Sequence, residues 1–251
     1  MEHLYGLTLS LLIADLPVEV WWSGEIPLQS PLFKNIVEES DRVWMDSAKF
    51  SQPHKALALL ALTWKEHFPN IVLADLNWIR FLRWRNLIAE LFDGKWASYL
   101  DLIREVTIEY GERRQPTRSF LLVCWLASRL GWHYEGRPLQ NFPERLEFAG
   151  HGGKVAVTIN PVPVMDQERD RLYGVRILTA NGHQGKFSVV RDKDPQCVLA
   201  RSEIDGKLAF SRMLYFEHLE SVRLLVEGLQ HLGRDSSWED TLAMLASIIK
   251  A

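Results

Sequence analysis

Two short glycine-rich turns contain the residue types that could bind a phosphate. Residues 150–154 have the sequence GHGGK, and residues 182–186 have the sequence GHQGK. The backbone N–H groups of glycines can face a phosphate, and Lys154 and Lys186 would add positive charge. The spacing of a P-loop is absent, and no helical pattern follows either turn. We therefore prefer to interpret both as polar β-turns, with weak sugar-phosphate binding as the alternative.

Other short motifs that carry chemistry are absent from the sequence. It contains no G-x-S-x-G, no H-E-x-x-H and no G-x-G-x-x-G after a predicted strand. The eight histidines are scattered, and the two cysteines, Cys124 and Cys197, form no C-x-x-C pair. We expect no catalytic residues, no metal site and no cofactor, and therefore a protein that is not an enzyme.

One basic, tryptophan-containing segment is the best candidate for a partner-binding surface. Residues 77–85 contain three arginines and two tryptophans and no acidic residue. Arginine and tryptophan are enriched at binding hot spots, and arginines three positions apart lie on nearby parts of one helical face. The candidate residues are Arg80, Arg83, Trp84, Trp21 and Trp22. The alternative is an amphipathic helix whose arginines face solvent and whose tryptophans are core.

The charge balance limits the classes of partner. The net charge is −3, and no stretch has the sustained basic run that a nucleic-acid backbone requires. The apolar stretch at 7–16 is interrupted by Thr8, Ser10 and Asp15 and is too short to span a bilayer. We expect a cytoplasmic protein that binds neither nucleic acid nor membrane.

The elements that position these residues alternate between strands and helices in the first part of the chain. Apolar runs predict strands at 7–14, 18–22, 42–46 and 71–74. Helical spacing predicts helices at 31–39, at 53–67 with Ser51 as its cap, and at 77–92. Strand–helix alternation with short connections is typical of a mainly parallel sheet. Residues 1–94 are therefore expected to form an α/β domain.

Residues 95–251 are expected to form an α+β domain with an antiparallel sheet and C-terminal helices. A helix at 95–103, a strand at 105–110 and a buried, almost entirely apolar helix at 117–130 come first. Strands follow at 154–160, 172–179, 186–191 and 197–202, with Asn181-Gly182 as a hairpin turn. Helices at 217–232 and 236–250 close the chain, the second with a capping box from Ser236 and Glu239.

Polar residues follow the predicted parallel strands and suggest a ligand edge. They are Trp22 and Gly24, Asp46 and Ser47, Asp75 and Asn77, and Tyr110. In open α/β sheets, ligands bind at the carboxyl ends of the strands. The alternative is helix capping, because Asp, Ser and Asn are natural N-cap residues.

Several longer strings occur in the sequence. In chain order they are VWWSGE at 20–25, DRV at 41–43 with DSAKF at 46–50, LADLNW at 73–78 continuing through RFLRWR at 80–85, WLASRLGW at 125–132 and LGRD at 232–235. Together they resemble the OpcA family, the assembly and allosteric partner proteins of glucose-6-phosphate dehydrogenase. The resemblance covers nearly the whole chain in the same order. These strings are far more specific than a glycine pattern.

The resemblance implies two fused domains that bind glucose-6-phosphate dehydrogenase, promote its oligomeric assembly and activate it in the oxidative pentose phosphate pathway. The family has no agreed catalytic residues. Familiar members start with a longer N-terminal segment, so we expect an edge of the first sheet to be missing or supplied by another chain. Cys124 and Cys197 do not match the cysteines through which cyanobacterial members respond to thioredoxin. The alternative function is a sugar-phosphate sensor or residual enzyme that uses the strand ends or the glycine turns.

Overall fold

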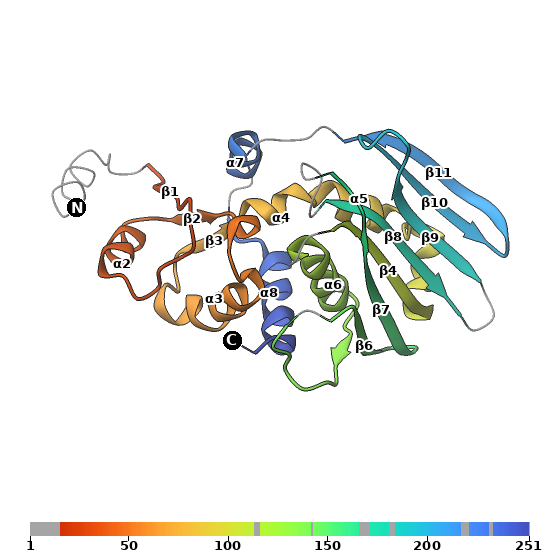
Figure 1. Ribbon diagram of the computed structural model, residues 1–251, viewed down its shortest axis with the longest axis horizontal. Coiled ribbons are helices and arrows are strands. Elements are labelled where there is room, and N and C mark those ends of the chain that lie inside the picture. Colours follow the sequence, from red (N-terminus) through yellow and green to blue (C-terminus); the bar gives the residue numbers. More distant parts are fainter. Residues whose placement is uncertain are drawn as a thin grey trace.

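The computed structural model describes residues 16–112, 116–141, 143–165, 171–180, 184–216, 221–230 and 233–250. The strand predicted at 7–14 and the predicted Asn181-Gly182 turn lie outside these residues. The small sheet and the large sheet occupy opposite ends of the molecule, with helices between them (Figure 1).

A three-stranded parallel sheet forms the first part, as the alternating pattern predicts. Its strands, in spatial order, are β1 (Glu19–Trp21), β2 (Arg42–Met45) and β3 (Val72–Asp75). The connections run through α2 (Pro31–Glu38) and α3 (Pro53–His67). Ser30 caps α2 by accepting the backbone N–H of Phe33, and Pro31 occupies the first turn, where a missing N–H costs nothing.

Two predicted caps are wrong. The residue before α3 is Gln52, whose side chain makes no capping bond, while Ser51 donates its backbone N–H and hydroxyl to Glu25 instead. The helix at the C-terminus, α8 (Ser236–Ile248), starts at Ser236, and Asp235 is its cap. Asp and Ser are equivalent N-cap types, so adjacent candidates cannot be separated by residue type alone.

The single helix predicted at 77–92 is two helices, α4 (Leu76–Arg80) and α5 (Leu82–Glu90). Phe81 lies between them with φ −109° and ψ 17°, outside helical geometry. Its ring packs edge-on against Trp78 at 5.2 Å, so burial of the two rings accompanies the break. The helix predicted at 95–103 is a 3₁₀ helix, η2 (Gly94–Leu102).

An eight-stranded sheet forms the second part. Its spatial order is β11-β10-β9-β8-β4-β7-β6-β5, and neighbouring strands are antiparallel except β4 and β7. The strands that sequence patterns predict are β4 (Ile103–Gly111), β7 (Gly153–Val162), β8 (Leu172–Thr179), β9 (Gly185–Arg191) and β10 (Cys197–Ile204). The three missed strands are β5 (His133–Tyr134), β6 (Arg145–Gly150) and β11 (Lys207–Tyr215).

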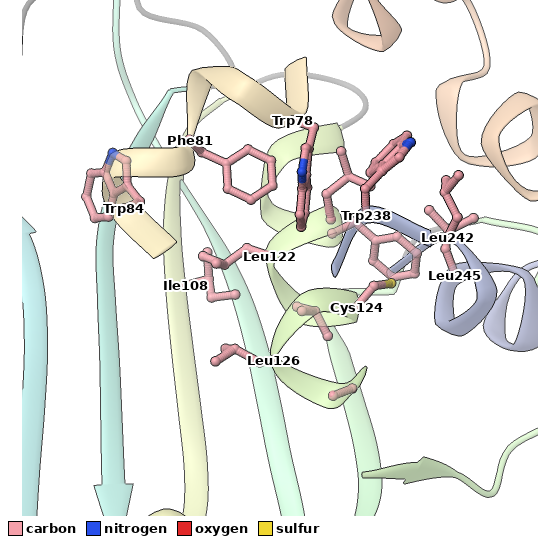
Figure 2. Packing of buried hydrophobic residues seen from close by; sticks show 14 of the residues in the cluster. Trp78, Phe81, Trp84, Ile108, Leu122, Cys124, Leu126, Trp238, Leu242 and Leu245 are labelled. Carbon is pink, nitrogen blue, oxygen red and sulfur yellow. The ribbon is translucent and has the colours of Figure 1, made fainter. Parts of the chain in front are cut away.

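Helices join the two sheets through one apolar core. The helix α6 (Thr117–Arg129) places Leu122 and Leu126 toward Ile108 of β4, and Trp238 of α8 lies near Trp78 on its other side (Figure 2). The helix α8 packs against both α3 and α6. Because one buried cluster contains residues from both sides of position 94, the division into domains 1–94 and 95–251 remains a prediction.

The remaining helix, α7 (Ser221–Leu229), packs on α4 and on the small sheet. Gly228 allows this approach, because a Cβ at that position would lie 2.3 Å from the ring of Trp44. Leu224 of α7 completes a small buried cluster with Trp44 and Leu76. The helix therefore places its residues beside α4, where the predicted partner-binding segment lies.

Candidate functional site

Of the polar residues named at the predicted strand ends, those after β2 and at the end of β3 meet at the carboxyl edge of the small sheet, whereas Tyr110 lies on β4 of the large sheet. Asp75 ends β3 and accepts the backbone N–H of Ser47 at 3.0 Å, the Ser47 hydroxyl at 2.5 Å and the backbone N–H of Asn77 at 2.9 Å. Asn77 donates its side-chain N–H to the Ser47 oxygen at 3.1 Å. Burial, opposed by these hydrogen bonds, raises the pKa of Asp75 to about 6. These side chains bind one another and cap the following helices.

A buried ion pair lies beside this network. Asp46 follows β2, and its carboxylate accepts two N–H groups from Arg80 of α4, at 2.5 Å and 2.7 Å. The Asp46 side chain is 2% exposed and the Arg80 side chain 13%. Arg80 also donates to the hydroxyl of Ser221 at 3.2 Å, which links α4 to α7. Arg80 therefore bonds both to Asp46 at the sheet edge and to Ser221 of α7, and only a small part of its side chain reaches solvent.

Three of the predicted partner-binding residues line one cavity. Arg80, Arg83 and Trp84 surround a space of about 140 Å³ together with residues of the second part. Its described lining residues carry five guanidinium groups and a single carboxylate, that of Glu227. We call this the arginine pocket; its arginines are Arg80, Arg83, Arg118, Arg171 and Arg191.

The sequence segment at 77–85 could not identify the other three arginines. Arg118 lies in the first turn of α6 and donates to the Asn77 side chain at 2.9 Å. Arg171 precedes β8, and Arg191 ends β9 with its guanidinium 5.6 Å from the ring centre of Trp84. Only the packing of α6 and the folding of the large sheet bring these positions to α5.

Arg83 and Trp84 differ in accessibility. The Arg83 side chain is 46% exposed, and it pairs with the carboxylate of Glu227 at 3.9 Å. Trp84 is buried and packs edge-on against Phe216 at 6.1 Å. Arg83 is thus an accessible cation of the pocket, while Trp84 forms its floor.

The tryptophan pair at 21–22 lies elsewhere. Trp21 ends β1 and is 39% exposed. Trp22 packs edge-on against Phe33 at 4.9 Å and donates its ring N–H to the carbonyl of Glu25 at 3.0 Å. Neither ring is among the described residues that line the arginine pocket, so the structure does not bring all five candidates together.

The two candidate phosphate-binding lysines do not converge. Lys154 lies on β7 and Lys186 on β9, with β4 and β8 between them. Three strand spacings separate them by roughly 14 Å. Exposed Glu105 of β4 lies between them on the same face, so a negative charge interrupts the row.

Close packing and backbone geometry explain the glycines at 152 and 153 in the GHGGK turn. A Cβ at Gly152 would lie 2.1 Å from the carbonyl oxygen of Asp101, and Gly153 has φ +125°. Tight approach and positive φ both require glycine. The glycine at 185 donates its N–H to the hydroxyl of Thr179 at 2.8 Å.

The described part of the chain contains no group of three or more His, Cys, Asp or Glu side chains placed to hold a metal ion. Cys124 is buried, and burial raises the pKa of its thiol. Among the described helices, none combines the length and the apolar character that a membrane span requires.

Comparisons with known proteins cover nearly the whole chain. Residues 71–242 match the family described as the C-terminal domain of the glucose-6-phosphate dehydrogenase subunit, and residues 1–62 match the family of the corresponding N-terminal domain. Proteins named as the OxPP cycle protein OpcA from Nostoc punctiforme and from Synechocystis are 29% and 25% identical over the full chain. The chain spans about half the length of these relatives, 55% and 54% respectively.

Solved structures resemble the fold more distantly. A glucose-6-phosphate 1-dehydrogenase from Mycobacterium avium gives a TM-score of 0.46 at 12% identity over 99% of this chain and 72% of its own. The WlbA dehydrogenase from Bordetella pertussis gives 0.44 at 10% identity over 97% of this chain and 79% of its own. At these scores the likeness carries no functional assignment.

Proposed function

Because the chain belongs to the OpcA family of glucose-6-phosphate dehydrogenase subunits, we propose that it binds glucose-6-phosphate dehydrogenase, promotes its oligomeric assembly and activates it allosterically, without catalysing a reaction itself. The family match over residues 71–242, together with that over 1–62, carries this proposal. The relatives named as OxPP cycle protein OpcA support a role for this chain in the oxidative pentose phosphate cycle.

We further propose that the arginine pocket is the contact surface. Its described lining residues gather five guanidinium groups around one carboxylate, and Arg83 presents its charge to solvent. Guanidinium groups bind carboxylates in bidentate geometry, and arginines near aromatic rings are frequent at interface hot spots. The partner would supply acidic side chains. Arg83, and not Arg80, is the residue to change, because Arg80 also holds Asp46.

A charge reversal tests this surface. Arg83→Glu should place a negative charge opposite the acidic groups of the dehydrogenase, and like charges across an interface cost several kcal/mol. The concentration of the chain that half-activates the enzyme should rise by about tenfold or more, equivalent to about 1.4 kcal/mol. The readout is dehydrogenase activity titrated against wild type and variant.

Arg145 offers a matched control. Its side chain is exposed and lies 3.7 Å from Glu147 on β6, much as Arg83 lies 3.9 Å from Glu227. Arg145→Glu should leave the titration unchanged. Identical curves for Arg83→Glu and wild type would exclude the arginine pocket as the contact. Wild-type protein that neither binds nor activates the enzyme would refute the proposed function.

A further inference from the structure

Arg85 is a buried arginine at the junction of two cavities. It lies on α5, two residues beyond Arg83, and is only 5% exposed. One adjoining cavity has a volume of about 340 Å³ and the other about 590 Å³. Arg85, Leu82, Asp235 and Ser236 line both, so the two spaces meet at these residues.

The protein gives Arg85 little to neutralise its charge. Its Nη2 donates to the Trp78 carbonyl at a long 3.4 Å, its Nε has no hydrogen-bond partner, and its guanidinium lies 3.3 Å from the ring centre of Trp78. No carboxylate of a described residue forms an ion pair with it. Burial lowers the pKa of Arg85 to about 9, opposed by the charge of Asp235. Burying a cation without a bonded anion costs free energy, and an anionic ligand bound beside the guanidinium would offset that cost.

The charge of Asp235 favours the charged form of Arg85, but its two carboxylate oxygens bond to other groups and form no ion pair with Arg85. One accepts the ring N–H of Trp78 at 2.7 Å, and the other accepts the backbone N–H of Trp238 at 3.1 Å. It stands at the start of α8, where its carboxylate satisfies the N-terminal helix turn. Arg85 therefore has a negative charge nearby but no carboxylate of a described residue bonded to it.

The smaller cavity has the composition of a site for a phosphorylated metabolite. Two further arginines line it. Arg42 is 5% exposed, its Nε lacks a partner, and it lies 3.8 Å from Glu19; Arg234 lies 3.5 Å from Glu239. The carboxyl groups of Asp75 and Asp235 also line the cavity, so a bound phosphate would sit on the arginine side. The rings of Trp44, Trp78 and Trp238 supply aromatic walls. Arginine binds phosphate oxygens in bidentate geometry, and small-molecule sites combine apolar walls with a few polar groups in a volume of this order.

We propose that this cavity binds a small phosphate monoester with a hydroxylated body, of sugar-phosphate size, with its phosphate on Arg85. Ser236 and Asp235 would accept hydrogen bonds from the hydroxyl groups of the body. This goes beyond binding of the dehydrogenase, because this chain, and not the enzyme, would bind the metabolite. The helix α5 carries both Arg85 and Arg83, so ligand and enzyme would contact neighbouring positions of one helix.

Binding to the isolated chain tests this proposal without the dehydrogenase. The probes are glucose 6-phosphate, ribose 5-phosphate, inorganic phosphate and uncharged glucose, measured by calorimetric titration and thermal melting. A sugar phosphate should release or absorb heat saturably and raise the melting temperature, because a ligand that binds only the native state stabilises it. Inorganic phosphate should bind more weakly, and glucose should have no effect.

Two variants test the site, one by removing its charge and one by reducing its volume. Arg85→Gln removes the charge and should weaken binding by about tenfold or more. Val72→Phe fills the same cavity from β3 and leaves Arg85 in place, so it remains informative if Arg85→Gln does not fold. Arg145→Gln, on β6 and outside the lining of both cavities, should bind like wild type.

Two results would overturn the proposal. One is wild-type protein that binds none of the phosphorylated probes. The other is sugar-phosphate binding that both Arg85→Gln and Val72→Phe leave unchanged. Either result would leave the proposed dehydrogenase partnership untouched, because the enzyme is absent from these titrations.

Discussion

Replacing Arg80 by alanine should destabilise the protein strongly, although the residue lies in the predicted partner-binding segment. The sequence alone predicts that Arg80→Ala together with Arg83→Ala keeps the fold and loses activation. The structure changes this expectation for Arg80. Its guanidinium makes both short bonds to Asp46, whose side chain is only 2% exposed. Removing it leaves the carboxylate buried, with the exposed Lys49 amine at 4.0 Å as a remaining cation.

The expected loss follows from that burial. Removing one partner of a buried ion pair typically costs about 3–5 kcal/mol, and the partial exposure of Arg80 places our expectation at about 3 kcal/mol. For a chain of this size, that corresponds to a fall in melting temperature of roughly 6–12 °C. Arg83→Ala is the matched control, because its 3.9 Å pair with Glu227 is nearly half exposed on both sides. Its effect should stay within about 0.5 kcal/mol.

Urea unfolding followed by circular dichroism and tryptophan fluorescence gives these free energies. A double-mutant cycle with Asp46→Asn isolates the coupling, because neutralising the carboxylate removes the charge that Arg80→Ala strands. The loss caused by Arg80→Ala should therefore be much smaller in the Asp46→Asn background. An Arg80→Ala variant within about 1 kcal/mol of wild type would refute this reasoning.

Three other features of the fold can be tested by unfolding or by thiol alkylation. Asp75 has a folded pKa of about 6, above its ordinary value of 3.8, so its contribution to stability is fully present below about pH 3.8 and is lost as the pH rises to about 6. Relative to Asp75→Asn, wild type should lose about 3 kcal/mol across that window, and a difference in unfolding free energy that is constant with pH would contradict this. Gly228→Ala should cost about 1–3 kcal/mol in thermal or urea unfolding because its methyl group meets the Trp44 ring, and unchanged stability would show that α7 shifts freely. Cys124 should resist thiol alkylation in the native protein, because burial raises its pKa, and mass spectrometry that finds it modified before unfolding would contradict its placement.

Local patterns predicted the small sheet well. Short apolar runs ending in polar residues indicated β2 and β3, and the helical spacing at 53–67 indicated α3 with its observed bounds. The parallel arrangement followed from alternation, because strands linked by crossover helices must run in the same direction. The meeting of Asp46, Ser47, Asp75 and Asn77 at one edge followed in turn.

Patterns failed where tertiary contacts decide the local structure. Trp78, Phe81 and Trp84 are all buried at three-residue spacing. The apolar pattern therefore continues through Phe81, and the sequence does not reveal that the helix breaks there. The edge strand β11 is exposed along most of its length, including Leu208, Met213 and Tyr215, so it lacks the alternation that identifies a half-buried strand.

The candidate site was only partly predictable for a related reason. Arg80, Arg83 and Trp84 stand out within one short segment, because composition is visible locally. Arg171 and Arg191 stand alone in their own segments, and the pairing of β8 with β9 brings them beside α5. Helical spacing places Arg85 on another side of the helix from Arg80 and Arg83, but its burial could not be predicted from the segment alone.

The proposed partnership of this chain with glucose-6-phosphate dehydrogenase can be tested on the two purified proteins. Sedimentation velocity of the purified cognate dehydrogenase, alone and with fluorescently labelled chain, tests it most directly. We predict that the label co-sediments with the enzyme and that the enzyme shifts toward a larger oligomer in a saturable, salt-sensitive manner. Independent sedimentation of the two proteins at every ratio, with the enzyme distribution unchanged, would contradict the proposed partnership.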